Sequence, residues 1–504
     1  MFTEATGSSL GALAEAAEAR FGDQSTLLFE GVELTSTQIG ALGRRFATGL
    51  TSIGVRPGDR VAVCMANCVE VLASYNATWR IGAAVTPLLF LLSEDELRHA
   101  LSDSGAAAVV TTPEFLPKVL AACAGLDTRC IVSGEPTDAA LSFAELSAGA
   151  EASLVAVDPG EMAALLYTGG TTGRSKGVVL SHDAMSYAAW AGVKSGEDDG
   201  FGVALLPLPL AHAFGLTVST LALHAVRPGR TVLMRWFDPA GWLQLAQDQR
   251  VEYGALVPTM LRLLTTQPLD DFDLSALRKL VSGSAPLPAE IAEQWARRLP
   301  TVEVVEGYGC SETSAIASMT PTGRNRPGSV GRAAPGVDIR IVGTEKAGAD
   351  GEICIRTPSL MTGYWHDPDA TAGAVRDGWF HTGDIGHLDD DGYLFIVDRK
   401  KYLIIRGGFN VYPRDIEDAL AEHPDVQMAG VVGRPDPRQG EEVIAYVSAR
   451  AGAEIEPAAV IEWARERIGG YRYPREVHVI DAIPLTPVGK VDRKALRARV
   501  VQPA

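Results

Sequence analysis

The stretch that decides the fold of this chain is YTGGTTGRSKGVVLSH, residues 167–182. Its centre, residues 169–177, holds four glycines, three hydroxyl side chains and two cations. Consecutive glycines let several backbone N–H groups point into one concavity, and hydroxyl and ammonium groups add donors for a phosphate. The stretch lacks the G-x-x-x-x-G-K-[ST] spacing of a Walker A loop. It also predicts a loop between two strands, whereas a P-loop leads from a strand into a helix. A flexible surface hairpin is the alternative that this stretch leaves open.

Outward from this loop, short apolar runs alternate with helical patterns along most of the chain. Strands are expected at residues 59–65, 83–89 and 106–112, and helices at residues 68–82 and 93–105. The second helix is expected to be capped by Ser93. Such alternation predicts right-handed crossovers and parallel sheets. We expect an α/β protein whose large N-terminal domain consists of layered α/β subdomains with parallel-type sheets and a small β-rich part.

The pattern changes near residue 398. The remaining chain predicts a compact α+β unit, with helices at residues 413–423 and 457–468, strands at 426–432, 442–449 and 477–480, and a basic last helix. Its size is that of one domain. We therefore expect an N-terminal core over residues 1–397, a hinge at 398–402 and a small mobile C-terminal domain over 403–504.

Composition excludes several classes of protein. The chain has 504 residues, of which 46% are hydrophobic, and a formal net charge of -17, so a nucleic acid is not an expected partner. The six cysteines include no C-x-x-C pair, which favours reduced thiols over a disulfide framework or a zinc ribbon. The first residues have no basic start, and the apolar runs are far shorter than 18 residues, so we expect no export signal. We expect a soluble cytoplasmic protein without an integral membrane segment.

Six further motifs follow the opening loop in a fixed order. They are LPLAHAFG (208–215), SGSAPL (282–287), EGYGCSET (306–313), HTGD (381–384), VDRKKYLIIRGGFNVYP (397–413) and PLTPVGKVDRKAL (484–496). With these motifs in this order, the chain resembles the acyl-adenylate-forming superfamily, which includes acyl-CoA synthetases, the adenylation domains of nonribosomal peptide synthetases and firefly luciferase. The likeness extends from about residue 25 to residue 497.

The resemblance implies an ATP-dependent carboxylic acid:CoA ligase of the AMP-forming type. A carboxylate is a poor acyl donor, so it is first converted with ATP to an acyl-AMP, with release of pyrophosphate, and then to a thioester. Bringing two anions together requires cations and oriented dipoles in a site closed to water. The implied cofactors and co-substrates are ATP, Mg²⁺ and CoA.

The resemblance also assigns nucleotide-binding residues, motif by motif. The phosphate cradle is expected to comprise Thr168, Gly169, Gly170, Thr171, Thr172, Gly173 and Lys176. The adenine and α-phosphate are assigned to Gly283, Ser284, Ala285, Pro286, Gly307, Tyr308, Gly309 and Ser311, and the ribose to Asp384 and Arg399. Glu312 is the expected Mg²⁺ ligand, since Mg²⁺ takes few protein carboxylates and completes its shell with phosphates and water.

Catalytic and acyl-binding roles are assigned in the same way. Lys490 is expected to bridge the incoming carboxylate and the α-phosphate in one closed state of the small domain. Without the surrounding motifs, Lys490 would be interpreted as a solvated surface charge, and His212 would be interpreted as a buried core histidine. Catalytic roles are predicted for Lys490, His212 and Lys176, and an acyl pocket for His212, Phe214, Gly307 and Ala315, with Leu216 and Val257 as apolar neighbours. The missing side chain of Gly307 and the apolar neighbours favour a fatty or other hydrophobic acid, with aromatic acids included.

The small domain is expected to contribute the CoA path. Gly407 and Gly408 would let a slender thiol chain pass close to the backbone, although a glycine hairpin that merely turns the chain is an open alternative. Lys401 is the predicted hinge residue. Asp398 and Tyr402 depart from the family's usual hinge residues, and the loop reads YTGG and CSE where YTSG and a threonine before the glutamate are common.

Two other functions are considered, the first of them because of the hinge departures. The first is an adenylating enzyme that delivers its activated group to a carrier-protein thiol or an amine, or that activates an unusual oxyanion. The second, a nucleotide-binding regulator without turnover, is disfavoured by Lys490, Glu312 and Asp384. A homodimer is left open. Chain length and the choice between aliphatic and aromatic acids are also left open.

Overall fold

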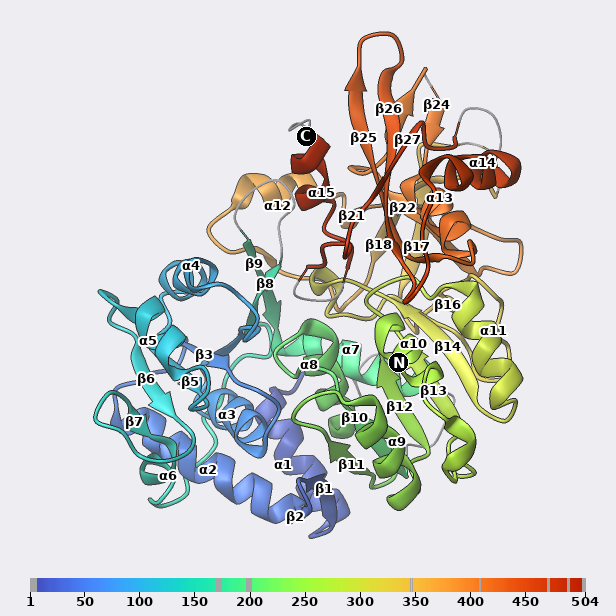
Figure 1. Cartoon of the computed structure of the whole chain (residues 1–504). Helices are drawn as coiled ribbons and strands as arrows, with labels where there is room; N and C mark the ends of the chain where they lie inside the picture. Colours follow the sequence, from blue (N-terminus) through green and yellow to red (C-terminus); the bar gives the residue numbers. More distant parts are fainter. Residues whose placement is uncertain are drawn as a thin grey trace. The chain divides into compact units, whose positions relative to one another are not determined.

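The structure, a computed structural model, describes residues 7–168, 175–195, 202–344, 346, 348–407, 409–468, 472–486 and 490–500 (Figure 1). It consists of two compact units. The first comprises Met1–Asp338 and Arg356–Phe380, and the second Ile339–Ile355 and His381–Ala504. Each unit is described separately below.

One sheet of the first unit has eight strands. Its order is β19 (Gly363–Tyr364), β9 (Lys176–Ser181), β8 (Met162–Thr168), β4 (Ala84–Pro87), β3 (Arg60–Cys64), β5 (Ala108–Thr111), β6 (Arg129–Val132) and β7 (Leu141–Ser142). The strands from β8 to β7 are parallel, while β9 and β19 run antiparallel to their neighbours. The expected strand–loop–strand arrangement of the opening stretch is therefore confirmed by β8 and β9.

The second sheet of this unit has nine strands. Its order is β16 (Arg332–Ala333), β15 (Ser318–Met319), β14 (Glu303–Tyr308), β13 (Lys279–Ser282), β12 (Tyr253–Leu256), β10 (Val203–Leu206), β11 (Arg230–Leu233), β1 (Ser25–Phe29) and β2 (Val32–Thr35). The six strands from β14 to β1 are parallel. The predicted α/β class with parallel sheets is thus confirmed.

Helices connect and cover these strands. They are α1 (Leu10–Phe21), α2 (Ser36–Ser52), α3 (Val69–Arg80), α4 (Glu94–Ser104), α5 (Leu116–Cys123), α6 (Phe143–Leu146), α7 (His182–Ser195), α8 (Ala213–Thr220), α9 (Pro239–Asp248), α10 (Pro258–Thr265), α11 (Ala289–Arg298) and α12 (Pro368–Ala374), with short 3-10 turns η1 (Leu221–His224), η2 (Leu269–Asp271) and η3 (Ser311–Thr313). As expected, Ser93 caps α4, and it does so in a capping box with Glu96.

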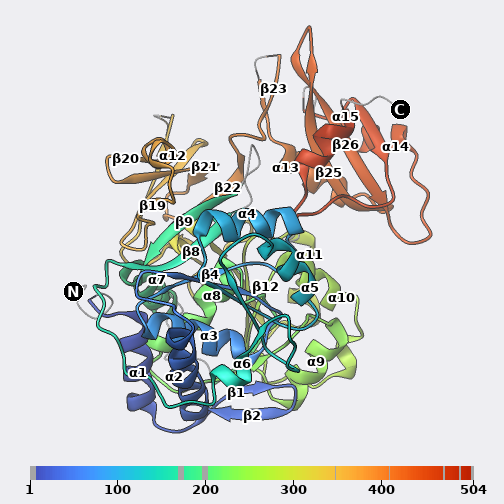
Figure 2. The same cartoon turned by 90° about the vertical axis from the view of Figure 1, so that its left-hand side faces the viewer.

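A hydrophobic core joins the two sheets, because residues such as Val63 and Val85 of the first belong to one buried cluster with Tyr253 and Val281 of the second. Burial of this apolar surface is the main stabilising contribution. Figure 2 shows α1 and α2 side by side at the edge of this unit.

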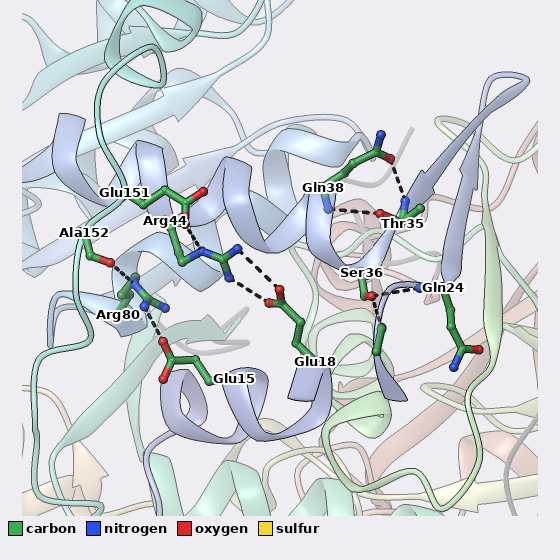
Figure 3. A network of polar contacts seen from close by, with 11 residues as sticks. Glu15, Glu18, Gln24, Thr35, Ser36, Gln38, Arg44, Arg80, Glu151 and Ala152 are labelled. Carbon is green, nitrogen blue, oxygen red and sulfur yellow. Dashed lines mark hydrogen bonds and ion pairs between the residues drawn. The ribbon is translucent and has the colours of Figure 1, made fainter. Parts of the chain in front are cut away.

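Arg44 on α2 and Arg80 on α3 link these helices and α1 to the connector that precedes β8 (Figure 3). The Arg44 guanidinium donates to Glu18 at 2.8 Å and also pairs with Glu151. Arg80, which is 4% exposed, donates to the Ala152 carbonyl at 2.7 Å and pairs with Glu15. These bonds satisfy charged groups that would otherwise be costly to bury.

The second unit is built on two five-stranded sheets. One has β17 (Asp338–Val342), β18 (Gly351–Arg356), β21 (Trp379–Leu388) and β20 (Val375–Arg376) in order, with β22 (Leu394–Arg399) also paired to β21. Its end strand β20 lies within Arg356–Phe380 and is counted with the first unit. The other has β24 (Phe409–Val411), β23 (Ile404–Arg406), β26 (Gly440–Ala449) and β25 (Val426–Asp436), with β27 (Glu476–Val479) paired to β26. Its helices are α13 (Pro413–Ala421), α14 (Pro457–Ile468) and α15 (Arg493–Val500).

The helices and strands expected after residue 403 are all present. The compact unit is larger than the predicted C-terminal domain, because residues 339–355 and 381–397 belong to it through the sheet of β17, β18, β21 and β22. The hinge at residues 398–402 stays a prediction. In the described part of the chain, no helix is both long and apolar enough to span a bilayer.

Candidate active site

The predicted phosphate cradle begins and ends on β8 and β9. Thr168 and Lys176 are the last residue pair of this antiparallel ladder, and the Thr168 hydroxyl lies 3.5 Å from the Lys176 carbonyl oxygen. The predicted cradle residues Gly169, Gly170, Thr171, Thr172 and Gly173 lie outside the described residues. The ladder therefore fixes both ends of the loop.

Lys176 lies against the segment that follows β19. Its ammonium group is 3.1 Å from the Asp367 carboxylate and 5.2 Å from the centre of the Tyr364 ring. The side chains of Lys176 and Asp367 are 46% and 39% exposed. The Asp367 carboxylate also accepts the Ala370 N–H, and this bond, followed by the Lys176 charge, lowers the pKa of Asp367. Lys176 is thus a solvent-accessible cation that already has an internal counter-ion.

The motif EGYGCSET forms the end of β14 and a tight turn after it. A Cβ on Gly309 would lie 2.1 Å from the Ala315 carbonyl oxygen, so only glycine fits there. The Cys310 N–H donates to the Thr313 hydroxyl at 3.2 Å, and the backbone of Ser314 and Ala315 is left-handed. This geometry presents the short η3 turn, with Ser311 and Glu312, at the carboxyl end of a parallel strand, where ligands bind in open α/β sheets.

Glu312 is held by the same segment that holds Lys176. The Tyr364 hydroxyl donates to its carboxylate at 2.9 Å, and its carbonyl accepts the Met361 N–H at 2.8 Å. Burial, followed by the Glu312 charge, raises the pKa of Tyr364, so the phenol remains a donor. Tyr364 and Asp367 were not predicted, because the sequence interpretation did not single out residues 361–367.

Among the described residues, no group of three or more histidine, cysteine or acidic side chains could hold a metal ion. The described residues therefore contain no metal site made of protein ligands alone. A single oriented carboxylate fits Mg²⁺ that arrives with a nucleotide, since such an ion takes one or two carboxylates and completes its shell with phosphates and water. Glu312 is compatible with this role.

The predicted adenine floor packs against a predicted acyl-pocket residue. A Cβ on Gly283 would lie 3.0 Å from the Phe214 ring. The backbone of Ser284 is left-handed, with φ 68°, and the next segment is fixed by a bond from the Leu287 N–H to the Glu306 carboxylate at 3.1 Å. The structure thus brings residues 283–287 together with the start of α8 and the end of β14.

His212 caps α8. Its Nδ1 accepts the Phe214 N–H at 3.3 Å. The segment before it is anchored by buried Asn67, whose amide donates to the Leu208 carbonyl at 2.8 Å and accepts the Leu210 N–H at 2.9 Å. Sequence reasoning missed Asn67, because an isolated asparagine before a helix is typical of any turn.

Gly307 faces a side chain of its own sheet. A Cβ there would lie 3.1 Å from the sulfur of Met319, which is the residue opposite Gly307 on β15. Leu216 is buried in the main core, and Phe214 and Val257 pack against that core. Phe214, Leu216 and Val257 therefore border or enter the main core, and the space beside Gly307 is filled by a flexible methionine. The acyl pocket itself stays a prediction.

In the second unit, the two predicted ribose ligands contact each other. Asp384 on β21 lies opposite Arg399 on β22, and the Arg399 guanidinium donates to the Asp384 carboxylate at 2.6 Å. Asp384 is 3% exposed. Asp398, which precedes Arg399 in the chain, accepts the Arg414 N–H at 3.0 Å and so connects the predicted hinge to the start of α13. The Lys401 ammonium lies 5.1 Å from the Tyr402 ring centre.

Lys490 ends a hairpin stem. The Thr486 N–H donates to the Lys490 carbonyl at 2.7 Å, the Lys490 N–H donates to the Thr486 hydroxyl at 3.2 Å, and Leu485 bridges Val491. Gly407 lies after β23 with φ 58°, a left-handed conformation that by itself favours glycine. The CoA role of Gly407 stays a prediction beside the glycine-turn alternative, and Gly408 lies outside the described residues.

Comparison with known proteins decides the family. The profile of the AMP-binding enzyme family matches residues 13–365, and that of the AMP-binding enzyme C-terminal domain matches residues 415–490. This chain is an AMP-binding enzyme.

The relatives of this AMP-binding enzyme include a feruloyl-CoA synthase from Amycolatopsis, 36% identical over 476 residues, with 93% of this chain and 94% of the relative covered. A long-chain-fatty-acid–CoA ligase from Bacillus subtilis is 33% identical over 522 residues, with 95% and 92% covered. The solved structure of an amide bond synthetase from Marinactinospora thermotolerans has a TM-score of 0.87 and 30% identity, with 97% and 99% covered.

These matches confirm the superfamily predicted from the ordered motifs. They also confirm the predicted enzyme class, an AMP-forming acid–thiol ligase. ATP, Mg²⁺ and CoA are the cofactors and co-substrates of this class, as predicted.

Proposed function

We propose that this AMP-binding enzyme joins an uncharged, hydrophobic acyl group, aromatic or fatty, to CoA. The observation that carries the proposal is a cavity of about 180 Å³ in the first unit. It lies against β10, β11 and β12 and the face of α8 that carries Val218. Its lining is apolar or uncharged throughout and includes Leu206, Leu210, Leu233, Tyr253 and Ala255.

The cavity adjoins the predicted acyl residues along the chain. Leu210 lies two residues before His212, and Val218 lies one helical turn after Phe214, on the same face of α8. An apolar cavity of about 150 Å³ is large enough to hold benzene. A space of this size and polarity suits one aromatic ring or a medium-length aliphatic chain, and it disfavours a second carboxylate, which would be buried without a partner.

The relatives support the same class of acid. The feruloyl-CoA synthase and the long-chain-fatty-acid–CoA ligase are named for acids with an apolar or aromatic group. Both are similar to this chain over more than nine tenths of its length.

The first step we propose is attack of the carboxylate oxygen on the α-phosphorus of ATP. The bond from that phosphorus to the bridging oxygen breaks, and pyrophosphate leaves. Lys176 would contact the leaving phosphates, Tyr308 would stack on adenine, and Lys490 would neutralise charge on the reacting oxygens. Mg²⁺ held by Glu312 would supply further neutralisation of the phosphates.

The second step transfers the acyl group. The CoA sulfur attacks the acyl carbon, a carbon–sulfur bond forms, the bond to the AMP oxygen breaks and the thiol proton passes to water. His212 is the N-cap of α8, and we propose that it shields and orients the reacting carbonyl.

A second candidate function keeps the first step and changes the acceptor. It is favoured by the likeness to the amide bond synthetase, whose name implies that an amine receives the acyl group. A carrier-protein thiol is a further acceptor that could replace CoA in the second step.

The test is pyrophosphate release from ATP with a panel of acids, each with CoA, with an amine or with neither. The panel contains ferulate, phenylacetate, octanoate, palmitate, acetate and malonate. We expect CoA-dependent turnover with acids that carry one ring or a medium chain. Turnover that is faster with malonate, or that depends on an amine and not on CoA, would contradict the proposal.

A further inference from the structure

The segment Met361–Asp367 contacts both predicted ionic ligands of the triphosphate. Its strand β19 pairs with β9, and the Trp365 N–H donates to the Gly177 carbonyl at 2.7 Å. At its other end, the Met361 N–H donates to the Glu312 carbonyl at 2.8 Å. The segment is therefore fixed by backbone bonds to the strand that carries Lys176 and to the turn that carries Glu312.

Tyr364 contacts both groups with one side chain. Its hydroxyl donates to the Glu312 carboxylate, and its ring lies 5.2 Å from the Lys176 ammonium. The hydroxyl engages the Oε1 atom of Glu312 at 2.9 Å and so limits the rotation of the carboxylate. Partners of this kind orient metal ligands, and losing one typically weakens metal binding by about tenfold or more.

Asp367 combines a structural bond with an electrostatic one. As the N-cap of α12, it accepts the Ala370 N–H at 2.9 Å, and its second oxygen lies 3.1 Å from the Lys176 ammonium. Since asparagine caps helices about as well as aspartate, the two functions can be separated by one substitution.

We propose that Tyr364 and Asp367 set the affinity of this enzyme for MgATP, Tyr364 by positioning Glu312 and Asp367 by competing with the triphosphate for Lys176. The inference rests on the proposed function, because it takes Glu312 as the Mg²⁺ ligand and Lys176 as a phosphate contact. It assigns opposite effects to two residues of one short segment. Purely structural roles would make both substitutions weaken binding.

The sign for each residue follows from charge. A triphosphate is a polyanion, so the Asp367 carboxylate repels it and occupies its cation until the nucleotide displaces it. Removing that charge releases Lys176 and strengthens ATP binding. Removing the Tyr364 hydroxyl leaves the Glu312 carboxylate free to rotate, so more Mg²⁺ is needed to form the complex.

The experiment compares Asp367→Asn, Tyr364→Phe and the control Asp369→Asn in the full-length protein. Asp369 lies in the first turn of the same helix and is exposed, so its substitution removes the same charge while it leaves the Lys176–Asp367 ion pair intact. Isothermal titration calorimetry measures the Kd for ATP at several Mg²⁺ and salt concentrations. Thermal unfolding checks that each variant is folded.

For Asp367→Asn we expect ATP to bind about two- to fivefold more tightly, with a gain that shrinks at high salt, as for an exposed ion pair. For Tyr364→Phe we expect about tenfold weaker binding at low Mg²⁺ and recovery at high Mg²⁺. Asp369→Asn should bind as the wild type does. Weaker binding by Asp367→Asn, an equal gain in Asp369→Asn, or a Tyr364→Phe defect that is independent of Mg²⁺ would overturn the inference.

Two reference variants separate this inference from the proposed function. Glu312→Gln and Lys176→Ala should each weaken MgATP binding. If both bind MgATP as the wild type does, the assigned nucleotide roles are wrong and the inference falls with them. If both weaken binding while Tyr364→Phe and Asp367→Asn do not change it, the inference alone is wrong.

Discussion

The Thr217 hydroxyl on α8 donates to the Ser314 carbonyl at 3.0 Å, and so joins the helix that His212 caps to the turn that carries Glu312. Both residues are buried, at 6% and 2% exposure. Ser314 is left-handed, and its own hydroxyl donates to the Ser359 carbonyl at 2.9 Å. The turn is thus fastened on two sides, and the Thr217 hydroxyl is a direct link from it to α8.

We predict that Thr217→Val destabilises the enzyme by about 1 to 3 kcal/mol, because the isosteric change leaves the buried Ser314 carbonyl without its donor. Thr217→Ser keeps the hydroxyl and is the matched control. Chemical denaturation measures the free energy of unfolding. Equal losses in the valine and serine variants would show that the Thr217 methyl group, and not the hydrogen bond, is responsible.

Lys490→Ala should lower the rate of adenylate formation by about 10²- to 10³-fold, the usual effect of removing one donor that stabilises developing charge. Thioester formation from supplied acyl-AMP should change far less, because the lysine is required only in the first step. Exchange of labelled pyrophosphate into ATP measures the first half-reaction, and release of AMP from acyl-AMP with CoA measures the second. Similar losses in both would mean that Lys490 acts by holding its hairpin together.

Ala255→Leu should fill part of the apolar cavity. We predict that kcat/KM falls about tenfold or more for ring-bearing or medium-chain acids and much less for acetate, because only the larger acids would use this space. The Kd for ATP should not change.

The matched control for Ala255→Leu is Ala246→Leu, which changes a buried alanine on α9 in the separate cluster around Trp242. It should destabilise the fold by about 1 to 3 kcal/mol through overpacking without altering acid preference. A loss at Ala255 that is the same for acetate and octanoate would contradict the substrate assignment.

The parallel strands could be predicted from the sequence, because each buried strand is a short apolar run between two helical patterns. The loop between β8 and β9 was equally clear, since β-branched residues follow it where a P-loop would have a helix. The Ser93 cap of α4 could also be predicted, because serine is a preferred N-cap residue. These features depend on residues close together in the chain.

Contacts between distant segments could not be predicted. The Asp367–Pro368 pair carries a visible signal for a helix start, since Pro is favoured at the first helical position, but nothing in it indicates that the cap meets Lys176. Strand β19 has only two residues, and its pairing with β9 brings Tyr364 to Glu312. For the same reason the sheet of β17, β18, β21 and β22 was not expected to belong to the second unit.

The last prediction concerns His182, the residue that ends the opening stretch and begins α7. Its Nδ1 accepts the Leu10 N–H at 3.2 Å, and it is 1% exposed. Burial lowers the pKa of His182 to about 4, against an ordinary value of 6.5. The folded state therefore binds this proton less readily than the unfolded state. The stability that neutral His182 contributes is fully present above pH 6.5 and is lost as the pH falls towards 4. At 1.36 kcal/mol per pKa unit, the loss is on the order of 3 kcal/mol.

His182→Gln does not titrate, so its unfolding free energy should fall less steeply than that of the wild type between pH 6.5 and 4. Denaturation curves at half-unit pH intervals measure both slopes. Parallel slopes would show that His182 is not the titrating group, and that His224, whose pKa is also lowered to about 4 by burial, is the next to test.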